Sequence, residues 1–277
     1  VVYFTTDKKT LPTVLSAAEA GFVKAELAAE KKLIVVNQYN KHVFIQLIEK
    51  KDKNVLMESL RKAGSQMADM INKLKVTEVL LTDAKLDDEL LAVAEGMALA
   101  NYQFLKYKTQ AEKEKNKLQT IFLHADALKQ KPKKVDQLQI LVDSVCRARD
   151  LVNEPVIYLT ATRLAEAFKK MGQEAGFKVE IFNKTKIESL KMGGLLAVNY
   201  GSVEPPTFTV MEYKPRNANN KRPYVLVGKG VVYDTGGLSL KPTPNSMDYM
   251  KCDMGGSAVV GATLYAIAKA KLPIHVI

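Results

Sequence analysis

A glycine-rich stretch near the carboxyl end constrains this chain more than any other feature. It follows a short apolar run, Tyr224 to Val227, which predicts a buried strand. Glycines then recur every few residues up to Gly256, as expected where a backbone turns sharply or approaches another group closely. The charged side chains of this stretch would be costly to bury unless they pair or coordinate a metal. Four of them are of interest for chemistry: Lys229, Asp234, Lys241 and Asp253.

Two interpretations of these charges are open from the spacing alone. In the first, Lys229 and Asp234 form a structural salt bridge on a glycine-rich turn. In the second, the carboxylates of Asp234 and Asp253 bind a divalent cation, because anionic oxygen donors suit such ions. Lys229 could then be a ligand only as the neutral amine, which burial beside a dication favours by lowering its pKa. The spacing does not decide between a salt bridge and a metal site.

The order of residues in this stretch resembles a known family. Lys229 to Lys241 reads Lys-Gly-x-x-x-Asp-Thr-Gly-Gly-x-Ser-x-Lys, and Asp253 to Gly256 reads Asp-Met-Gly-Gly. Both blocks are similar to the signature of the leucyl aminopeptidase family, the cytosolic dinuclear-metal exopeptidases. Two further stretches, 95–109 and 147–155, resemble the non-catalytic N-terminal domain of that family and the start of its catalytic domain.

The resemblance implies an activity and a set of site residues. The activity is release of N-terminal amino acids, leucine-like ones preferred, from peptides by a water that two divalent metal ions (Mn²⁺ or Zn²⁺) activate. Lys229, Asp234 and Asp253 would bind metal, and Lys241 would stabilise the developing oxyanion. Met250 would line the pocket for the first substrate side chain, although a core methionine is an equally good interpretation. The family also implies a bicarbonate as proton shuttle and a homo-oligomer of six chains.

One family motif has no match in this chain. The family carries a later Asp-x-Glu-x-Arg motif that supplies two more carboxylates and an arginine, and no part of the 277 residues corresponds to it. We therefore expect this chain to be a fragment that is inactive by itself. Arg149, Asp150 and Asn153 are polar, but at the end of a predicted helix they are expected to cap and pair rather than to act in catalysis.

Short apolar runs alternate with helical patterns along the chain, which predicts an α/β fold. Strands are predicted at 1–5, 33–36, 42–48, 76–81, 120–123, 178–182, 204–213, 224–227 and 274–277. Helices are predicted at 54–74, 86–105, 135–151, 160–175, 183–190 and 255–271. Polar stretches at 108–117 and 129–134 are predicted loops, and Gly193 and Gly194 are predicted turn glycines.

We expect two domains, each a mostly parallel sheet flanked by helices. Residues 1–134 would form a non-catalytic N-terminal domain, 135–152 a linking helix, and 153–277 the first part of the metallopeptidase catalytic domain.

Composition narrows the remaining function classes. The formal charge is +11, but 35 of the 41 basic residues are lysines scattered along the chain, which favours a solvated surface over a nucleic-acid site. Two cysteines, Cys146 and Cys252, are too few for a disulfide framework or a zinc site and are expected to be buried. No segment has the length of a membrane span or the pattern of a signal peptide, so a cytoplasmic location is expected. A DNA-binding member of the same family and a catalytically inactive module remain the alternatives.

Overall fold

The computed structural model describes residues 1–277 except 7–10, 50–51, 84–85 and 127–131. The chain forms two compact units, Val1–Gln139 (unit 1) and Ile140–Ile277 (unit 2). The helix α6 (Pro132–Asn153) contributes residues to both. The domain boundaries proposed from the sequence, at 134 and 152, stay a prediction. No helix in the described ranges is both long enough and apolar enough to cross a bilayer.

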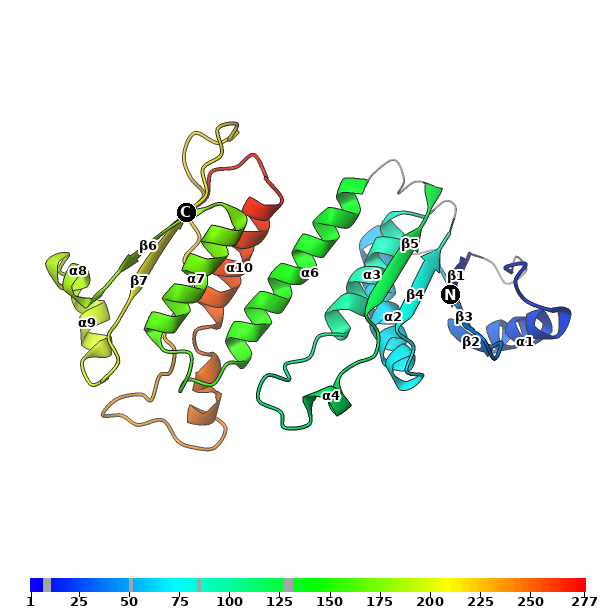
Figure 1. Ribbon diagram of the computed structural model, residues 1–277, viewed down its shortest axis with the longest axis horizontal. Helices are drawn as coiled ribbons and strands as arrows, with labels where there is room; N and C mark the ends of the chain where they lie inside the picture. Colours follow the sequence, from blue (N-terminus) through cyan, green and yellow to red (C-terminus); the bar gives the residue numbers. More distant parts are fainter. Residues whose placement is uncertain (7–10, 50–51, 84–85, 127–131) are drawn as a thin grey trace. The chain divides into compact units, whose positions relative to one another are not determined.

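Unit 1 is built on a five-stranded sheet with the order β2-β3-β1-β4-β5 (Figure 1). Its strands are β1 (Val2–Thr5), β2 (Leu33–Asn37), β3 (His42–Leu47), β4 (Glu78–Thr82) and β5 (Thr120–His124). All neighbouring pairs are parallel except β2 and β3, which a short turn joins in antiparallel orientation. The predicted α/β class with a mostly parallel sheet is confirmed.

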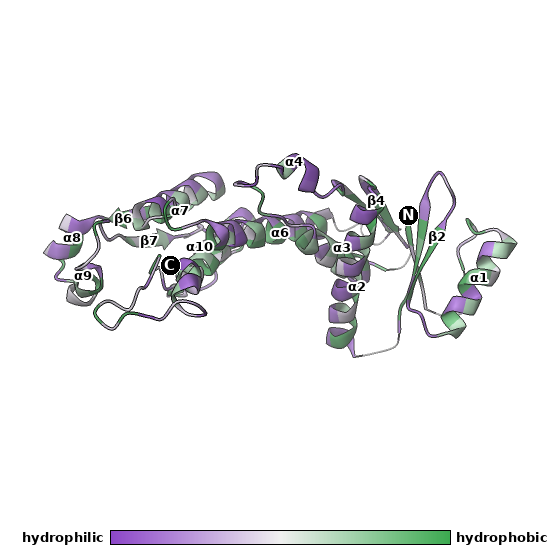
Figure 2. Cartoon of the chain, turned by 90° about the horizontal axis from the view of Figure 1, so that it is seen from below, coloured by the Kyte–Doolittle hydropathy of each residue, from purple (hydrophilic) through white to green (hydrophobic). Residues whose placement is uncertain are grey.

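Helices cover both faces of this sheet. Val23 and Leu27 of α1 (Ala17–Ala28) pack with Ile34 and Ile45 on one face. Phe44 lies in the core on the opposite face, because successive strand residues point to opposite sides. That core also contains α2 (Lys53–Lys73) and α3 (Asp88–Ala100). Figure 2 shows hydrophilic and hydrophobic residues alternating along α2, as expected for a helix with one buried side.

The helices α2 and α3 approach each other closely at two glycines. A Cβ atom at Gly96 would lie 2.0 Å from the carbonyl oxygen of Arg61, and one at Gly64 would lie 2.2 Å from the carbonyl oxygen of Val93. Only glycine fits such a contact between two backbones. The Glu95-Gly96 pair noted in the sequence therefore serves helix packing.

The predicted helix over 86–105 is too long, since α3 ends at Ala100. The side-chain amide of Asn101 donates a hydrogen bond to the carbonyl of Leu118 (2.9 Å) and its oxygen accepts one from Asn72 (2.9 Å). Asparagine competes with the helix for such backbone contacts, and here it directs the chain into a loop. The loop that follows includes the short helix α4 (Ala111–Glu114), within the predicted loop at 108–117.

Unit 2 packs helices against a smaller sheet. After α6 come α7 (Ala161–Ala175), β6 (Lys178–Phe182), α8 (Lys184–Ser189), α9 (Gly193–Asn199), β7 (Phe208–Glu212), the 3₁₀ helix η1 (Met247–Cys252) and α10 (Gly255–Lys269). Strands β6 and β7 are antiparallel, and the parallel pairing is a single bridge between Tyr224 and Val276. Phe168 of α7, Leu264 of α10 and Met211 of β7 belong to one core.

Several local predictions in unit 2 are wrong. Gly193 and Gly194 lie in the first turn of α9 and not in a turn. The run 224–227 is not a buried strand, because only Tyr224 forms a bridge and the exposed fractions of Val225 and Val227 are 64% and 89%. A sheet neighbour is missing along most of this run, as described below. Cys252 is exposed and Cys146 is half-buried, so neither is the buried cysteine expected.

The start of α6 also differs from the prediction. Pro132 to Lys134 form its first turn rather than the end of a loop, and the remaining residues of that predicted loop, 129–131, lie outside the described residues. Proline is well suited to a first helical turn because its missing N–H needs no partner there.

Candidate metal centre

Two glycines bring the segment that carries Lys229 against the start of α10. A Cβ atom at Gly228 would lie 2.7 Å from the Cα of Ser257, and one at Gly256 would lie 3.0 Å from the backbone nitrogen of Lys229. The N–H of Ser257 donates a hydrogen bond to the carbonyl of Lys229 (2.8 Å). This close approach places Lys229 beside Asp253, two residues before α10 begins.

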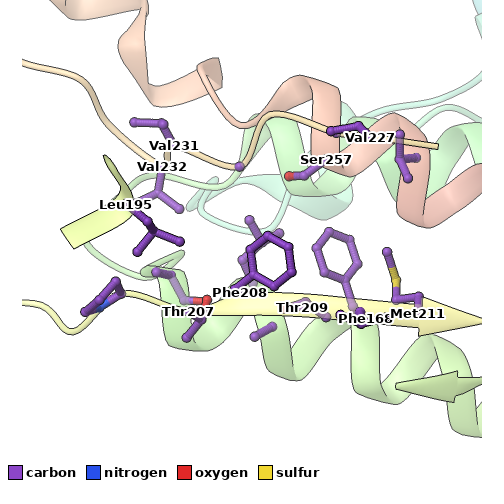
Figure 3. A pocket seen from close by; sticks show the side chains of 18 of the residues that line it. Phe168, Leu195, Thr207, Phe208, Thr209, Met211, Val227, Val231, Val232 and Ser257 are labelled. Atoms are coloured by element: carbon purple, nitrogen blue, oxygen red, sulfur yellow. The ribbon is translucent and has the colours of Figure 1, made fainter. Parts of the chain in front are cut away.

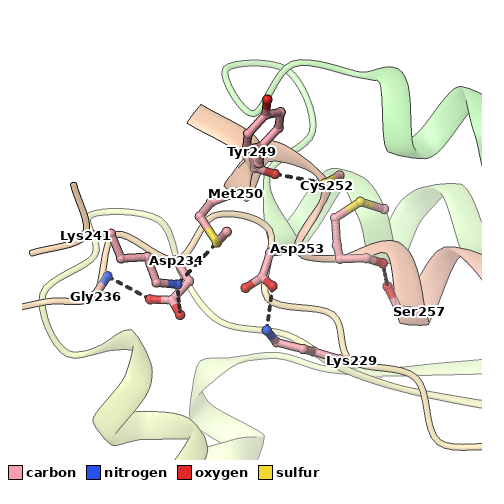
Figure 4. Close-up of polar contacts among 10 residues, drawn as sticks. Lys229, Asp234, Gly236, Lys241, Tyr249, Met250, Cys252, Asp253 and Ser257 are labelled. Carbon is pink, nitrogen blue, oxygen red and sulfur yellow. Dashed lines mark hydrogen bonds and ion pairs between the residues drawn. The ribbon is translucent and has the colours of Figure 1, made fainter. Parts of the chain in front are cut away.

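Lys229 and Asp253 form an ion pair, with 2.5 Å between Nζ and Oδ1 (Figure 4). The lysine side chain is 57% exposed, whereas the aspartate side chain is 14% exposed. The second carboxylate oxygen of Asp253, Oδ2, is buried and has no hydrogen-bond partner among the described residues. A buried anionic oxygen without a donor is costly, so this atom is well placed to accept a cation.

Asp234 and Lys241 form a second ion pair, with 2.7 Å between Oδ2 and Nζ (Figure 4). The other oxygen of Asp234 accepts a hydrogen bond from the N–H of Gly236 (2.8 Å), in a turn where Gly236 and Gly237 have φ of 88° and 67°. The hydrogen bond from Lys241 and then that from Gly236 lower the pKa of Asp234. Asp234 therefore carries its negative charge throughout the neutral range.

Met250 lies beside the second pair. Its Sδ is 3.2 Å from Nζ of Lys241, and it belongs to η1. The ammonium of Lys251, the next residue, donates a hydrogen bond to the carbonyl of Asn153 at the end of α6 (3.3 Å). The 3₁₀ helix is thus tied to α6 while its Met250 faces Lys241.

All five residues singled out in the sequence are thus found in two neighbouring clusters of unit 2. The ion-pair partners differ from the pair considered in the sequence, since Lys229 contacts Asp253 and Asp234 contacts Lys241. The two clusters are near enough for the charge of Lys229 to lower the pKa of Asp234 as well. Among the described residues no group of three or more His, Cys, Asp and Glu side chains could hold a metal, but one lysine amine with two carboxylates is a different donor set.

The residues present fit a divalent cation. They offer two carboxylates and a lysine amine, and one carboxylate oxygen is buried without a partner. Hard and borderline divalent ions favour such oxygen and nitrogen donors. An ion between the pairs would replace the contacts that the two ammonium groups now make with the two carboxylates.

Sequence reasoning missed two features of unit 2. One is a pair formed by the buried His275 and Glu212, with 2.8 Å between Nε2 and Oε1, for which the sequence gives no signal because 63 residues separate the two. The other is an apolar cavity of about 620 Å³ whose lining includes Gly228, Gly230 and Tyr233 but none of the five candidate residues. The exposed apolar run at 224–227 is the one local sign of that cavity.

Comparison with known proteins supports a family assignment. The chain matches the model of the cytosol aminopeptidase family N-terminal domain over residues 50–111 and that of the catalytic domain over residues 146–277. It is 40% identical over 245 residues to a probable cytosol aminopeptidase of Chloroherpeton thalassium, which covers 80% of this chain and 48% of that protein. It is 38% identical over 235 residues to one of Clostridium perfringens, covering 82% and 48%. The chain thus spans about half of the length of these curated relatives.

Two solved structures resemble the fold of the whole chain. The bottromycin maturation enzyme BotP in complex with Mn matches with a TM-score of 0.77 and 26% identity, over 99% of this chain and 56% of that one. A tomato leucine aminopeptidase mutant matches with a TM-score of 0.77 and 18% identity, over 99% and 57%, and shows the fold alone. With two family models matched over well over half of its residues, and with relatives that bear the same name, the chain belongs to the cytosol aminopeptidase family.

Proposed function

We propose that this chain supplies part of the active site of a metal-dependent aminopeptidase, acting within a full-length protein of the family. The observation that carries the proposal is the buried, unpartnered Oδ2 of Asp253 beside Lys229. An enzyme site tolerates such an atom when a cation binds it, whereas a purely structural salt bridge gains nothing from leaving it unpaired. Asp234 adds a second carboxylate near Lys229.

Each candidate residue has a role that its contacts make reasonable. Asp253 and Asp234 would hold the cation through their carboxylates, and Lys229 would complete this half of the site by losing its proton. Its ammonium is 57% exposed, so solvent can accept that proton. When bound, the divalent ions lower the pKa of an attacking water and polarise the scissile carbonyl.

Lys241 would keep its charge and donate to the developing oxyanion. Its side chain is 27% exposed and is held between Asp234 and Met250, so that it is sheltered but reachable from one side. A positioned cationic donor is worth more in such a sheltered place than in water. Met250 would then contribute apolar surface next to the reacting carbonyl, which suits a leucine-like first residue.

The finer parts of the proposal extend beyond these contacts. We propose two ions, Mn²⁺ or Zn²⁺, and the Mn complex of the related BotP supports manganese. A bicarbonate, an assembly of six chains and a cytoplasmic location belong to the same proposal, which the name of the curated relatives supports. By itself the chain offers three ligands, so we expect it to bind a cation weakly and to lack turnover.

Metal binding by the purified chain tests the proposal. Mn²⁺ is titrated into the chain while free Mn²⁺ is followed by electron paramagnetic resonance. We expect Asp253→Asn to abolish binding, because it removes the charge from the unpartnered oxygen. The matched control is Asp248→Asn, which makes the same change at an exposed position of η1.

Two outcomes would contradict the proposal. If both variants bind Mn²⁺ as the parent chain does, Asp253 is not a ligand and an inactive module with a salt bridge is favoured. If the chain alone hydrolyses leucine p-nitroanilide in Mn²⁺ or Zn²⁺, the proposed need for further ligands is wrong.

A further inference from the structure

The apolar cavity of unit 2 has the shape and the edges of a vacant strand position. It measures about 620 Å³ and lies between β7 and the extended segment 225–233 (Figure 3). We call it the strand slot. Phe168 of α7 and Leu264 of α10 contribute to its lining, and no charged side chain is among its lining residues.

The mouth of the slot already holds the first residues of a strand. Val276 exchanges two backbone hydrogen bonds with Tyr213, just after β7, both of 2.9 Å. On its other side, the N–H of Ile277 donates to the carbonyl of Tyr224 (2.9 Å), and the N–H of Leu226 donates to the carbonyl of Ile277 (2.8 Å). Residues 274–277 therefore run antiparallel to β7 and parallel to the segment that begins at Tyr224.

The same hydrogen-bonding pattern can continue into the slot on both sides. Because alternate residues of a strand direct their backbone groups to the same edge, Met211 and Thr209 face the slot as Tyr213 faces Val276. On the opposite side the next groups in register are the carbonyl of Leu226 and the N–H of Gly228. Within the described part of the chain, the N–H groups of Gly228 and Gly230 have no protein partner.

These edges are those of a sheet interrupted by one missing strand. Two facing rows of backbone donors and acceptors, 227–232 on one side and 208–211 on the other, cannot both be satisfied by a small ligand with a few polar atoms. An extended peptide satisfies both rows at once, and apolar side chains on it would pack on Phe168 and Leu264. A charged side chain in the slot would lose its hydration with no partner to replace it.

We propose that the strand slot receives one extended, apolar polypeptide strand, antiparallel to β7 and parallel to 225–231. The strand continues in the direction of Ile274–Ile277 and comes from the remaining part of a full-length family protein. The curated relatives, about twice as long as this chain, have residues enough to supply it. The slot is then an assembly surface, and the substrate is bound on the side of the segment where Lys229 lies.

Strand insertion would also act on the candidate metal centre, an inference that rests on the proposed function. The segment with an open edge at Gly228 and Gly230 carries Lys229 between them and Asp234 shortly after. Pairing along this edge would turn the segment into an interior strand and fix the backbone on which both ligands stand. Metal affinity should therefore rise when the slot is filled.

An extended version of the chain tests the proposal. Six residues, Thr-Val-Thr-Val-Thr-Val, are added directly after Ile277, and the control carries Pro in place of each Thr, which removes the donors toward β7. Amide hydrogen exchange is measured by NMR without metal. We expect the N–H groups of Met211 and Gly228 to exchange at least about tenfold more slowly with the threonine version and to be unchanged with the proline version.

Two results would overturn the proposal. Equal exchange in the two extended chains would show that no strand enters the slot. Protection of the same amides in the unextended chain that grows with protein concentration, together with dimers in sedimentation, would show that a second copy fills it. Since exchange is measured without metal, loss of Mn²⁺ binding would refute the proposed function and leave this result standing.

Discussion

Replacing Gly228 by alanine should disturb the candidate metal centre without touching any of its charged groups. The new Cβ would lie 2.7 Å from the Cα of Ser257 and 2.8 Å from the carbonyl oxygen of Gly256. Both neighbours are backbone atoms at the start of α10, and ordinary van der Waals contact begins at 3.4 Å. Neither can rotate away as a side-chain tip could, so the segment that carries Lys229 must move off α10.

The size of the effect follows from this clash. Forcing one extra methyl group into such a packed contact costs about 1–3 kcal/mol of unfolding free energy. The shift also moves Lys229 away from Asp253, and loss of a group that positions a metal ligand typically weakens metal affinity about 10- to 100-fold. We expect Gly228→Ala to show both changes in urea denaturation and Mn²⁺ titration.

A matched control lies two residues further along. A Cβ at Gly230 would lie 3.5 Å from the Cβ and Oγ of Ser257, an ordinary contact, so Gly230→Ala should leave stability within about 0.5 kcal/mol. If the two variants behaved alike in both assays, the close approach at Gly228 would not be what positions Lys229.

Three further predictions concern other parts of the chain. Gly96→Ala should destabilise unit 1 by about 1–3 kcal/mol because the methyl group meets the backbone of α2, whereas Gly21→Ala, with open space around it in α1, should stabilise it by about 0.5–1 kcal/mol; urea denaturation of both variants tests this, and equal effects would contradict it. In the full-length protein, Lys241→Ala should lower kcat for leucine p-nitroanilide at least about a hundredfold with little change in KM, and wild-type turnover would refute its role. The contact with Lys134 lowers the pKa of Asp88, so this carboxylate adds stability above its ordinary pKa of about 3.9 and loses it as the pH falls through the lowered value; Asp88→Asn should cost up to about 1 kcal/mol at pH 7 and nothing at pH 2, and an equal cost at both would contradict the pairing.

The elements that the sequence predicted well are those whose signals are local. The helix α7 begins after Thr160, whose hydroxyl accepts a hydrogen bond from the N–H of Arg163, and ends at Gly176 with a φ of 82°. Both signals are readable within one or two turns. The five strands of unit 1 were likewise predicted, because each is an apolar run between polar turns.

The predictions that failed depend on contacts distant in sequence. Asn101 ends α3 early through Leu118 and Asn72, which no helical pattern can indicate. The run 224–227 has the composition of a buried strand, but its exposure depends on whether another segment lies alongside. Likewise, the spacing of charges placed Lys229 near Asp234, whereas the packing of Gly228 on α10 pairs it with Asp253.

Crystals of the chain soaked in Mn²⁺ and measured at the manganese absorption edge would test the candidate metal centre most directly. We expect an anomalous peak about 2.0–2.2 Å from Oδ2 of Asp253, with a carboxylate oxygen of Asp234 and the amine of Lys229 turned toward it. A soaked crystal in which the Lys229–Asp253 and Lys241–Asp234 pairs persist and no peak lies beside Asp253 would contradict the assignment of these residues as a metal site.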